Sequence, residues 1–210
     1  MVIAIDGPAG SGKSTIARRI AEEKGWYFLN TGSFYRAYTL AQLEKGLDPL
    51  DRDSVLETAK NTEITVIDGD ICINGVNAES KLHTPVVDKF ASPVSSDPRL
   101  RAIVTDEVRA LAGTMNIVTE GRDTTTVIFP DAEYKFYFDA SIEERARRRL
   151  AEQKGVTLEE VIESIRKRDR NDMEKEVGAL KKAENAIYID TTNLTIDDVC
   201  EKVYSAMQKH

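Results

Sequence analysis

The sequence has few of the features that mark secreted, membrane-spanning or metal-binding proteins. Its 210 residues include two cysteines, Cys72 and Cys200, which lie far apart and have no metal-ligand residues beside them. We therefore expect both cysteines to be free thiols, packed in the core of a protein from a reducing compartment. The apolar run Val2–Ile5 is too short for a signal-peptide core, and no apolar run approaches membrane-spanning length. We therefore expect a cytoplasmic protein with no membrane partner.

Basic residues are also fewer than acidic ones. The sequence has 29 Lys and Arg and 36 Asp and Glu, which give a formal net charge of −7. Proteins that bind a nucleic-acid backbone usually carry a basic face, and the aromatic-rich motifs of RNA-binding modules are missing here. A nucleic-acid partner is thus disfavoured. Local arginine clusters can still bind small anions, so the acidic total does not exclude a nucleotide.

Short apolar segments alternate with amphipathic segments along most of the chain. Five segments have the composition of buried strands: Val2–Ile5, Trp26–Leu29, Ile117–Thr119, Tyr134–Phe138 and Ala186–Ile189. Helical spacing of apolar residues predicts helices over Ile16–Ala21, Phe34–Ala41, Glu143–Glu152, Leu158–Ile165 and Ile196–Met207. This alternation predicts an α/β protein with a five-stranded parallel sheet covered by helices on both faces.

One stretch, Ile64–Val76, has a different pattern. Its β-rich runs are separated by Asp68-Gly69 and Asn74-Gly75, dipeptides that favour tight hairpin turns because they tolerate positive φ. We expect a small antiparallel meander here. Since no internal repeat or linker is present, we expect a single domain over residues 1–210 with inserted subregions.

The strongest motif is Gly7-Pro8-Ala9-Gly10-Ser11-Gly12-Lys13-Ser14, which fits G-x-x-x-x-G-K-[ST] between a predicted strand and a predicted helix. In such a loop the glycines let backbone N–H groups surround a phosphate chain, and the helix adds its positive end. Lys13 would reach the β- and γ-phosphates of the nucleotide, and the Ser14 hydroxyl would bind Mg²⁺.

A phosphate-binding loop does not by itself identify a reaction. The sequence has no Asn-Lys-x-Asp guanine-binding motif, and the chain is short for a motor protein. A small kinase is favoured.

Five blocks in order resemble the bacterial cytidylate kinases. They are Ile5–Thr15, Leu29–Arg36, Gly121–Asp123 followed by Val127–Ala132, Arg168–Asp172 and Ile189–Thr192. The resemblance implies transfer of the ATP γ-phosphate to CMP, and to dCMP, with Mg²⁺, by a monomer. It also implies a three-layer P-loop kinase fold with a nucleoside-monophosphate-binding (NMP-binding) insertion at about 36–105, which contains the meander, and a helical lid at about 153–173.

The same resemblance assigns roles to individual residues. It implies that Gly7–Thr15, Arg145 and Arg149 bind ATP, with the two arginines on one helix face because they lie four residues apart. It places catalytic roles on Lys13, Arg122, Arg149 and Arg168. For CMP, it implies phosphate contacts from Thr31, Arg36, Arg122 and Lys175, base contacts from Ser92, Arg101 and Asp123, packing from Tyr35, and sugar contacts from Arg168 and Asp172.

These residue types suit the chemistry. Two phosphorylated substrates bring several negative charges together, and arginine neutralises them because it stays charged and forms paired hydrogen bonds. A carboxylate such as Asp123 can accept from the cytosine N4 amine. In UMP a carbonyl replaces that amine, so Asp123 would face an acceptor and discriminate against uracil.

The sequence departs from the family pattern at four places, which bear on base selectivity and phosphate affinity. Glu120 replaces the usual Asp, and Thr124-Thr125 replaces an apolar residue followed by Gly. Asn171 stands where Arg is common, and Lys175 where a phosphate-binding Arg is usual. The kinase class does not depend on these positions.

Several alternatives remain open at this stage. The chain could be a kinase for another acceptor, such as UMP, AMP or shikimate, or a non-catalytic nucleotide-binding regulator. Arg147 and Arg148 are expected to be solvated or ion-paired. Asp6 and Glu120 could order the water shell of Mg²⁺ or serve as structural hydrogen-bond acceptors.

Overall fold

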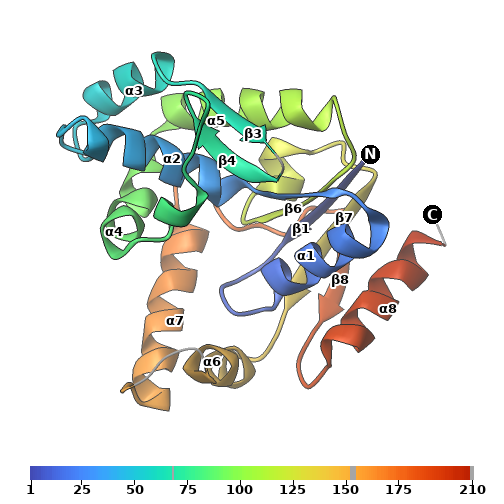
Figure 1. The fold of residues 1–210 in the computed structure, drawn as a ribbon. Helices are drawn as coiled ribbons and strands as arrows, with labels where there is room; N and C mark the ends of the chain where they lie inside the picture. Colours follow the sequence, from blue (N-terminus) through green and yellow to red (C-terminus); the bar gives the residue numbers. More distant parts are fainter. Residues whose placement is uncertain (68, 152–154, 209–210) are drawn as a thin grey trace. The chain divides into compact units, whose positions relative to one another are not determined.

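The computed structural model describes residues 1–67, 69–151 and 155–208, which fall into two compact units. One unit comprises Met1–Leu29 with Met115–His210, and the other comprises Asn30–Thr114. The first holds the main parallel sheet and the second a small antiparallel sheet (Figure 1). No helix in the described part of the chain is both long and apolar enough to cross a membrane.

The first unit is built on a five-stranded sheet with the strand order β2-β6-β1-β7-β8. Its strands are β1 (Val2–Asp6), β2 (Tyr27–Asn30), β6 (Ile117–Gly121), β7 (Tyr134–Asp139) and β8 (Ile187–Asp190). The parallel pairings β1–β6, β1–β7 and β7–β8 need crossover connections. The helices of this unit are α1 (Lys13–Lys24), α6 (Ile142–Ala151), α7 (Leu158–Glu174) and α8 (Ile196–Met207).

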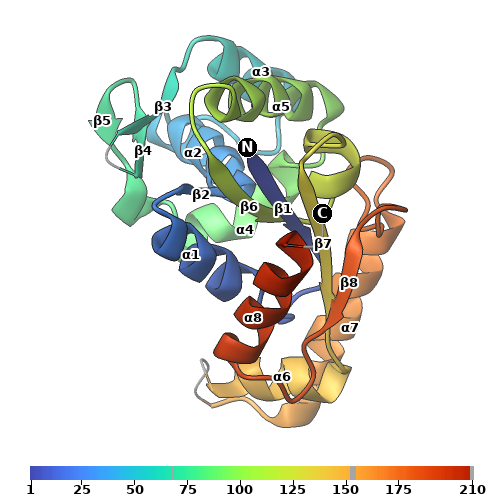
Figure 2. The same cartoon turned by 90° about the vertical axis from the view of Figure 1, so that its right-hand side faces the viewer.

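Two of these helices, α1 and α8, bury their apolar stripes on the same face of the sheet (Figures 1 and 2). Ile16 and Ile20 of α1 and Val199 of α8 share one core with Ile5 of β1 and Phe136 of β7. This burial explains the helical spacing seen in the sequence, since apolar residues three and four apart share a helix face.

The strand register brings the carboxyl ends of the three central strands to one edge of the sheet. Asp6 of β1 lies opposite Gly121 of β6 and Tyr137 of β7. Ligand sites of open α/β sheets form at this edge, where the loops after the strands meet. The loop after β1 is the glycine-rich motif.

The second unit contains α2 (Thr31–Glu44), α3 (Arg52–Lys60), α4 (Pro85–Val94) and α5 (Pro98–Ala112). Its sheet has the order β3-β4-β5, formed by β3 (Ile64–Ile67), β4 (Asp70–Ile73) and β5 (Val76–Asn77), and a 3₁₀ turn η1 (Glu79–Lys81) follows. Asn74 and Gly75 have φ of 50° and 78°, so both turn residues between β4 and β5 adopt the expected positive φ.

The five-stranded parallel sheet and the antiparallel meander are confirmed. Asp68, Glu152 and the first two residues of the expected lid, 153–154, lie outside the described residues. The helices α3, α4 and α5 were not anticipated, although Pro85 and Pro98 occupy first-turn positions that suit proline.

Candidate active site

The loop between β1 and α1 has a backbone that only glycine accommodates well. Gly7, Gly10 and Gly12 have φ of 151°, 80° and 87°. A Cβ at Gly7 would overlap the carbonyl oxygen of Phe138, so this position also needs glycine for space. Gly12 is the N-cap residue of α1 and provides no side-chain cap, which leaves the helix N-terminus suited to bind an anion.

Lys13 is buried inside this loop, with 4% of its surface exposed. Its Nζ donates to the carbonyl oxygen of Pro8 at 2.7 Å and to Ser11 Oγ at 3.3 Å. Burial, and then the positive charge of Arg122, lower the pKa of Lys13 to about 7. The ammonium group therefore lies among loop acceptors that a bound phosphate would outcompete, because a phosphate carries full negative charge.

Ser14 and Glu120 form an oxygen pair beside the loop. The Ser14 hydroxyl donates to Glu120 Oε1 at 3.0 Å, and Glu120 is 8% exposed. The described residues contain no group of three or more His, Cys, Asp or Glu side chains that could hold a metal ion. This donor set fits Mg²⁺ carried by a nucleotide, because Mg²⁺ takes most of its ligands from phosphates and water in such sites.

Asp6, at the end of β1, is fully buried and accepts hydrogen bonds from the chain that follows β6. Its donors are the Thr124 backbone N–H at 3.0 Å, the Thr125 backbone N–H at 2.7 Å and the Thr125 hydroxyl at 2.6 Å. Burial raises the pKa of Asp6, and the Thr125 bonds oppose this rise. Of the two roles considered for Asp6, these contacts favour the structural one.

Two residues of the expected CMP set, Arg122 and Lys175, contact a third, Asp172. Arg122 Nε donates to Asp172 Oδ2 at 2.7 Å, and Lys175 Nζ lies 3.1 Å from Asp172 Oδ1. Burial acts to raise the pKa of Asp172, but the charges of Arg122 and Lys175 outweigh it and lower that pKa. The cluster is a partly buried group of two cations and one anion.

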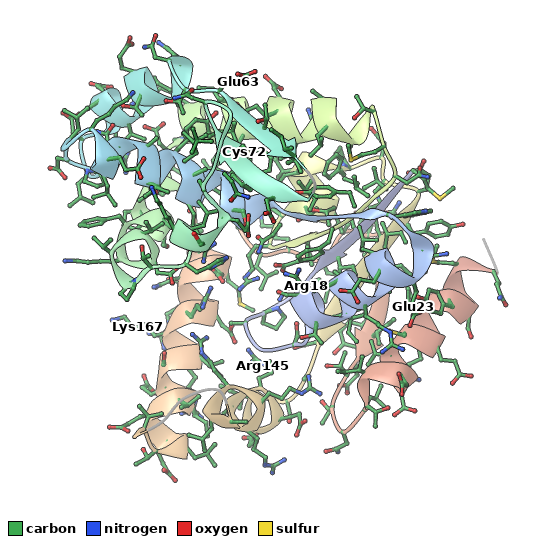
Figure 3. The ribbon with its side chains drawn as sticks, in the orientation of Figure 1. Arg18, Glu23, Glu63, Cys72, Arg145 and Lys167 are labelled. Atoms are coloured by element: carbon green, nitrogen blue, oxygen red, sulfur yellow. The ribbon has the colours of Figure 1, made fainter. Side chains whose placement is uncertain are left out.

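Arg145 of α6 is 7% exposed and contacts the glycine-rich loop (Figure 3). Its Nε donates to the Ala140 carbonyl at 3.1 Å, and its Nη1 donates to the Ala9 carbonyl at 3.1 Å and to Asp169 Oδ2 at 2.6 Å. Arg149 lies one turn further along α6 and is half-buried. The expected ATP contact of Arg145 would thus come from a guanidinium that already binds three protein oxygens.

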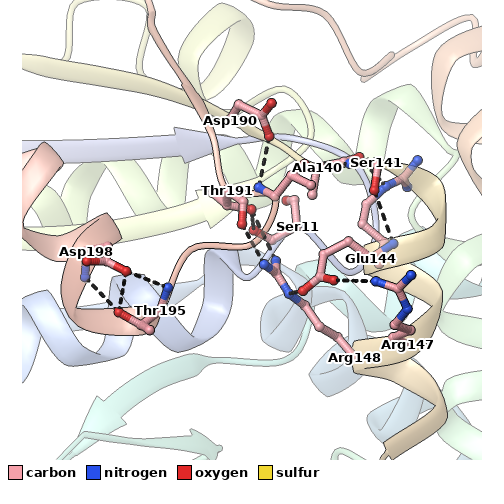
Figure 4. A network of polar contacts seen from close by, with 12 residues as sticks. Ser11, Ala140, Ser141, Glu144, Arg147, Arg148, Asp190, Thr191, Thr195 and Asp198 are labelled. Carbon is pink, nitrogen blue, oxygen red and sulfur yellow. Dashed lines mark hydrogen bonds and ion pairs between the residues drawn. The ribbon is translucent and has the colours of Figure 1, made fainter.

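Arg148 belongs to a second network beside the loop (Figure 4). Its guanidinium donates to the Thr191 carbonyl at 2.6 Å, to Thr191 Oγ1 at 3.1 Å and to Glu144 at 3.1 Å. The Thr191 hydroxyl lies 3.1 Å from the Ser11 carbonyl. Arg147 also bonds Glu144, at 3.2 Å, so the ion-paired interpretation of Arg147 and Arg148 is confirmed.

The second unit holds five of the expected CMP residues. Arg36 Nε donates to Asp88 of α4 at 2.9 Å, and Ser92, one turn further along α4, is exposed. The Arg101 guanidinium lies 5.5 Å from the centroid of the buried Tyr35 ring, in the range of a cation–π contact. Thr31 is buried at the start of α2.

The structure thus groups the predicted residues as two sets. In the first unit, contacts to nearby polar groups are made by Lys13, Ser14, Arg122, Asp172 and Lys175. In the second unit, the Arg101 guanidinium contacts the Tyr35 ring. Thr15 and Arg168 are exposed, and Asp123 is buried at the start of a short π-helical turn, η2 (Thr124–Ile128). Sequence reasoning missed Thr125, Asp169 and Thr191, whose partners lie far away in the chain.

A parallel sheet whose central strand ends in a phosphate-binding glycine loop, with a cationic cluster after the neighbouring strand, defines a P-loop kinase. The chain belongs to the cytidylate kinase family, whose model matches residues 3–209.

Curated relatives cover nearly the whole chain. The sequence is 41% identical over 212 residues to a cytidylate kinase of Caldanaerobacter subterraneus subsp. tengcongensis, covering 99% of this chain and 95% of the relative. It is also 41% identical over 211 residues to a cytidylate kinase of Carboxydothermus hydrogenoformans, covering 97% and 95%. A Clostridium botulinum cytidylate kinase is 36% identical over 211 residues, covering 99% and 97%.

Solved structures support the fold alone. An uncharacterized protein from Eubacterium ventriosum superposes with a TM-score of 0.58 at 14% identity, covering 100% of this chain and 99% of that chain. A gluconokinase from Sinorhizobium meliloti superposes with a TM-score of 0.50 at 13% identity, covering 99% and 91%.

Proposed function

We propose that the protein transfers the γ-phosphate of ATP to CMP, and also to dCMP, by in-line displacement. The observation that carries this proposal is the buried Lys13 of the glycine-rich motif together with the cluster of Arg122, Asp172 and Lys175. Burial, and then the charges of Arg122 and Arg168, lower the pKa of Lys13, and the carboxylates of Glu120 and Asp6 oppose this shift. Phosphoryl transfer needs such concentrated positive charge more than acid–base groups.

The roles follow the resemblance to the family. Backbone N–H groups of Gly7–Thr15 and the Lys13 ammonium bind the ATP phosphates, and Arg149 neutralises charge on the transferred group. For Arg145 the resemblance implies a direct ATP contact, whereas its bonds to protein oxygens favour an indirect role. Mg²⁺ would bind the Ser14 hydroxyl beside Glu120 and polarise the phosphate oxygens when present.

For CMP, we propose that Arg36, Arg122, Lys175 and Thr31 bind the phosphate and that Arg168 and Asp172 bind the sugar. Ser92, Arg101 and Asp123 read the base, with Tyr35 packing behind Arg101. These assignments rest on the matching blocks of the family. We further propose that residues 36–105 form the NMP-binding region and 153–173 a lid that excludes water.

We also propose that the protein is a monomer and that it works in the cytoplasm. Both cysteines are buried and unbridged, as expected in a reducing compartment, and the family resemblance implies a monomer.

An acceptor panel tests the proposal. ADP release from ATP is measured by a coupled assay with CMP, dCMP, UMP, AMP and shikimate at equal concentrations. We expect CMP and dCMP to give the highest rates, because Asp123 accepts from the cytosine amine. Preference for AMP, UMP or shikimate would contradict the cytosine assignment, and nucleotide binding with no acceptor-dependent turnover would indicate a regulator.

A further inference from the structure

Arg145 joins three segments of the first unit through one guanidinium. It contacts the glycine-rich loop at the Ala9 carbonyl, the end of β7 at the Ala140 carbonyl, and α7 at the Asp169 carboxylate. The Arg145 and Asp169 side chains are only 8% and 13% exposed, so solvent screens this pair little. A single buried cation therefore connects the nucleotide loop to another helix.

Arg145 bonds the loop at the carbonyl of the peptide group between Ala9 and Gly10. The carbonyl of Ala9 and the N–H of Gly10 belong to the same planar peptide unit. In the proposed ATP site, the Gly10 N–H donates to a phosphate, which polarises that unit and strengthens the Ala9 carbonyl as an acceptor. Phosphate binding would thus strengthen the hydrogen bond from Arg145.

The loop and α6 also pack against each other at this point. A Cβ at Gly10 would lie 3.1 Å from Arg145 Cβ and 3.1 Å from the Arg145 carbonyl oxygen. The loop backbone is thus close to the helix backbone, and a Cβ at Gly10 would be tighter than an ordinary van der Waals contact. A change in the loop conformation when ATP binds would press directly on Arg145.

Asp169 lies in the second half of α7, and the two halves of this helix have different partners. The first half packs on α6, where Val161 and Ile165 share an apolar cluster with Ala146. The second half carries Arg168 and Asp172, which are assigned to CMP. Asp169 therefore lies between the two residues of this helix that are assigned to CMP.

The pair uses only one carboxylate oxygen. Asp169 Oδ1 is buried, and no hydrogen-bond partner for it is found among the described residues. A buried carboxylate oxygen without a partner is costly. A small movement of α7 or of Arg145 could turn the single bond into the paired geometry that arginine and carboxylate prefer.

We propose that the Arg145–Asp169 pair is a positioning contact that transmits phosphate binding at the Gly7–Ser14 loop to α7, and so places Arg168 and Asp172 for CMP. The inference rests on the proposed function for the identity of the second substrate. The first step, from ATP to α7, does not require CMP. Arg145 and Asp169 act through other groups and are positioning residues.

A purely structural ion pair would give a different result. Removal of one partner of a buried ion pair leaves an uncompensated charge and destabilises the fold, so a purely structural role predicts a lower melting temperature and no change in the coupling between the ATP and CMP sites. A positioning role predicts that α7 responds to ATP alone and that this response needs Asp169.

Hydrogen–deuterium exchange of peptides from α7 tests this with MgATP and without CMP. In the wild type, we expect saturating MgATP to slow exchange in the second half of α7. In Asp169→Asn, we expect most of that protection to be lost while ATP still binds. The matched control is Glu163→Gln, which removes an exposed carboxylate of the same helix that lies 3.8 Å from Arg166, and it should behave as the wild type does.

Calorimetric titration of CMP with and without the analogue AMP-PNP gives a second readout. We expect AMP-PNP to raise the CMP affinity of the wild type by at least about five-fold, the low end of ordinary coupling, and Asp169→Asn to lose this gain. Arg145→Lys and Asp169→Glu keep the charges of the pair, so each should recover part of the gain in CMP affinity. These two variants replace Asp169→Asn in both experiments if that variant does not fold.

The inference would be overturned if MgATP slowed exchange in α7 equally in the wild type and in Asp169→Asn. It would also be overturned if MgATP did not change exchange in α7 of the wild type. Absence of CMP phosphorylation in the wild type would instead refute the proposed function and leave the exchange result standing.

Discussion

The hydroxyl of Thr125 offers a sharp test of how the site is held, because its neighbour Thr124 is a matched control. Thr125 Oγ1 donates to the buried Asp6 carboxylate at 2.6 Å. The Thr124 hydroxyl is equally buried, but no partner for it is found within the described ranges. Replacement of either threonine by valine preserves the shape of the side chain and puts a methyl group in place of the hydroxyl.

Thr125→Val should destabilise the protein by about 1.5–3 kcal/mol, since the lost bond is to a charged group. In a chain of this size that corresponds to a fall in Tm of about 3–12 °C, at about 2–4 °C per kcal/mol. Thr124→Val removes a buried hydroxyl without a partner, so its Tm should stay level or rise. Calorimetry of both variants at neutral pH measures the difference.

The same pair predicts a pH dependence with a definite sign. Burial already raises the pKa of Asp6 above its ordinary 3.8, so the cost of burying the ionised form appears as pH rises above 3.8 and reaches its full value above the folded-state pKa. Loss of the Thr125 hydroxyl raises this pKa further. The Tm deficit of Thr125→Val should therefore be largest at neutral pH and shrink toward pH 3.8.

Kinetics extend the test to the substrate site. Asp6 holds the residues that directly follow Arg122 and Asp123, so Thr125→Val should raise the KM for CMP more than the KM for ATP. Equal Tm values for the two valine variants, or a Thr124→Val protein that melts lower than Thr125→Val, would refute the role given to Asp6.

Three further predictions concern the proposed substrate contacts. Lys13→Ala should stay folded and lose turnover by about 10²-fold or more, as for other removed charge-stabilising donors, in a steady-state assay; near-normal rates would refute its role. Asp123→Ala should lower kcat/KM for CMP by a factor equivalent to about 1–3 kcal/mol, the worth of one base contact, and should change the KM for ATP little. Equal effects on CMP and ATP would make Asp123 structural. Asp172→Asn should cost about 1–3 kcal/mol in urea unfolding, because Arg122 and Lys175 lose a partly buried anion. Since the pKa of Asp172 is lowered on folding, its contribution is present above pH 3.8 and lost as pH falls below it, a dependence that Asp172→Asn should flatten.

Much of the fold could be predicted because it follows from local patterns. Val2–Ile5 and Tyr134–Phe138 are apolar runs of strand length, and both became central strands. Asn74-Gly75 predicted its turn because few other dipeptides tolerate two positive φ angles. The glycine-rich loop was identifiable for the same reason, since its glycines have a backbone that other residues adopt only under strain.

The contacts that hold the site could not be predicted, because they depend on strand register and helix orientation. Asp6 and Thr125 are brought together only when β1 pairs with β6. The spacing of Arg145 and Arg149 indicated a shared helix face but not that Arg145 would be buried against Ala9. The helix α4 was missed, and Pro93 within it weakens the helical pattern.

The most direct measurement follows the phosphate itself. The protein is incubated with CMP, Mg²⁺ and ATP that carries an isotopic label in its γ-phosphate, and the products are separated and identified. Direct transfer predicts the label in the β-phosphate of CDP, with one CDP formed for each ADP. Label found only in inorganic phosphate, or in the diphosphate of another acceptor in preference to CDP when acceptors compete, would contradict a CMP kinase.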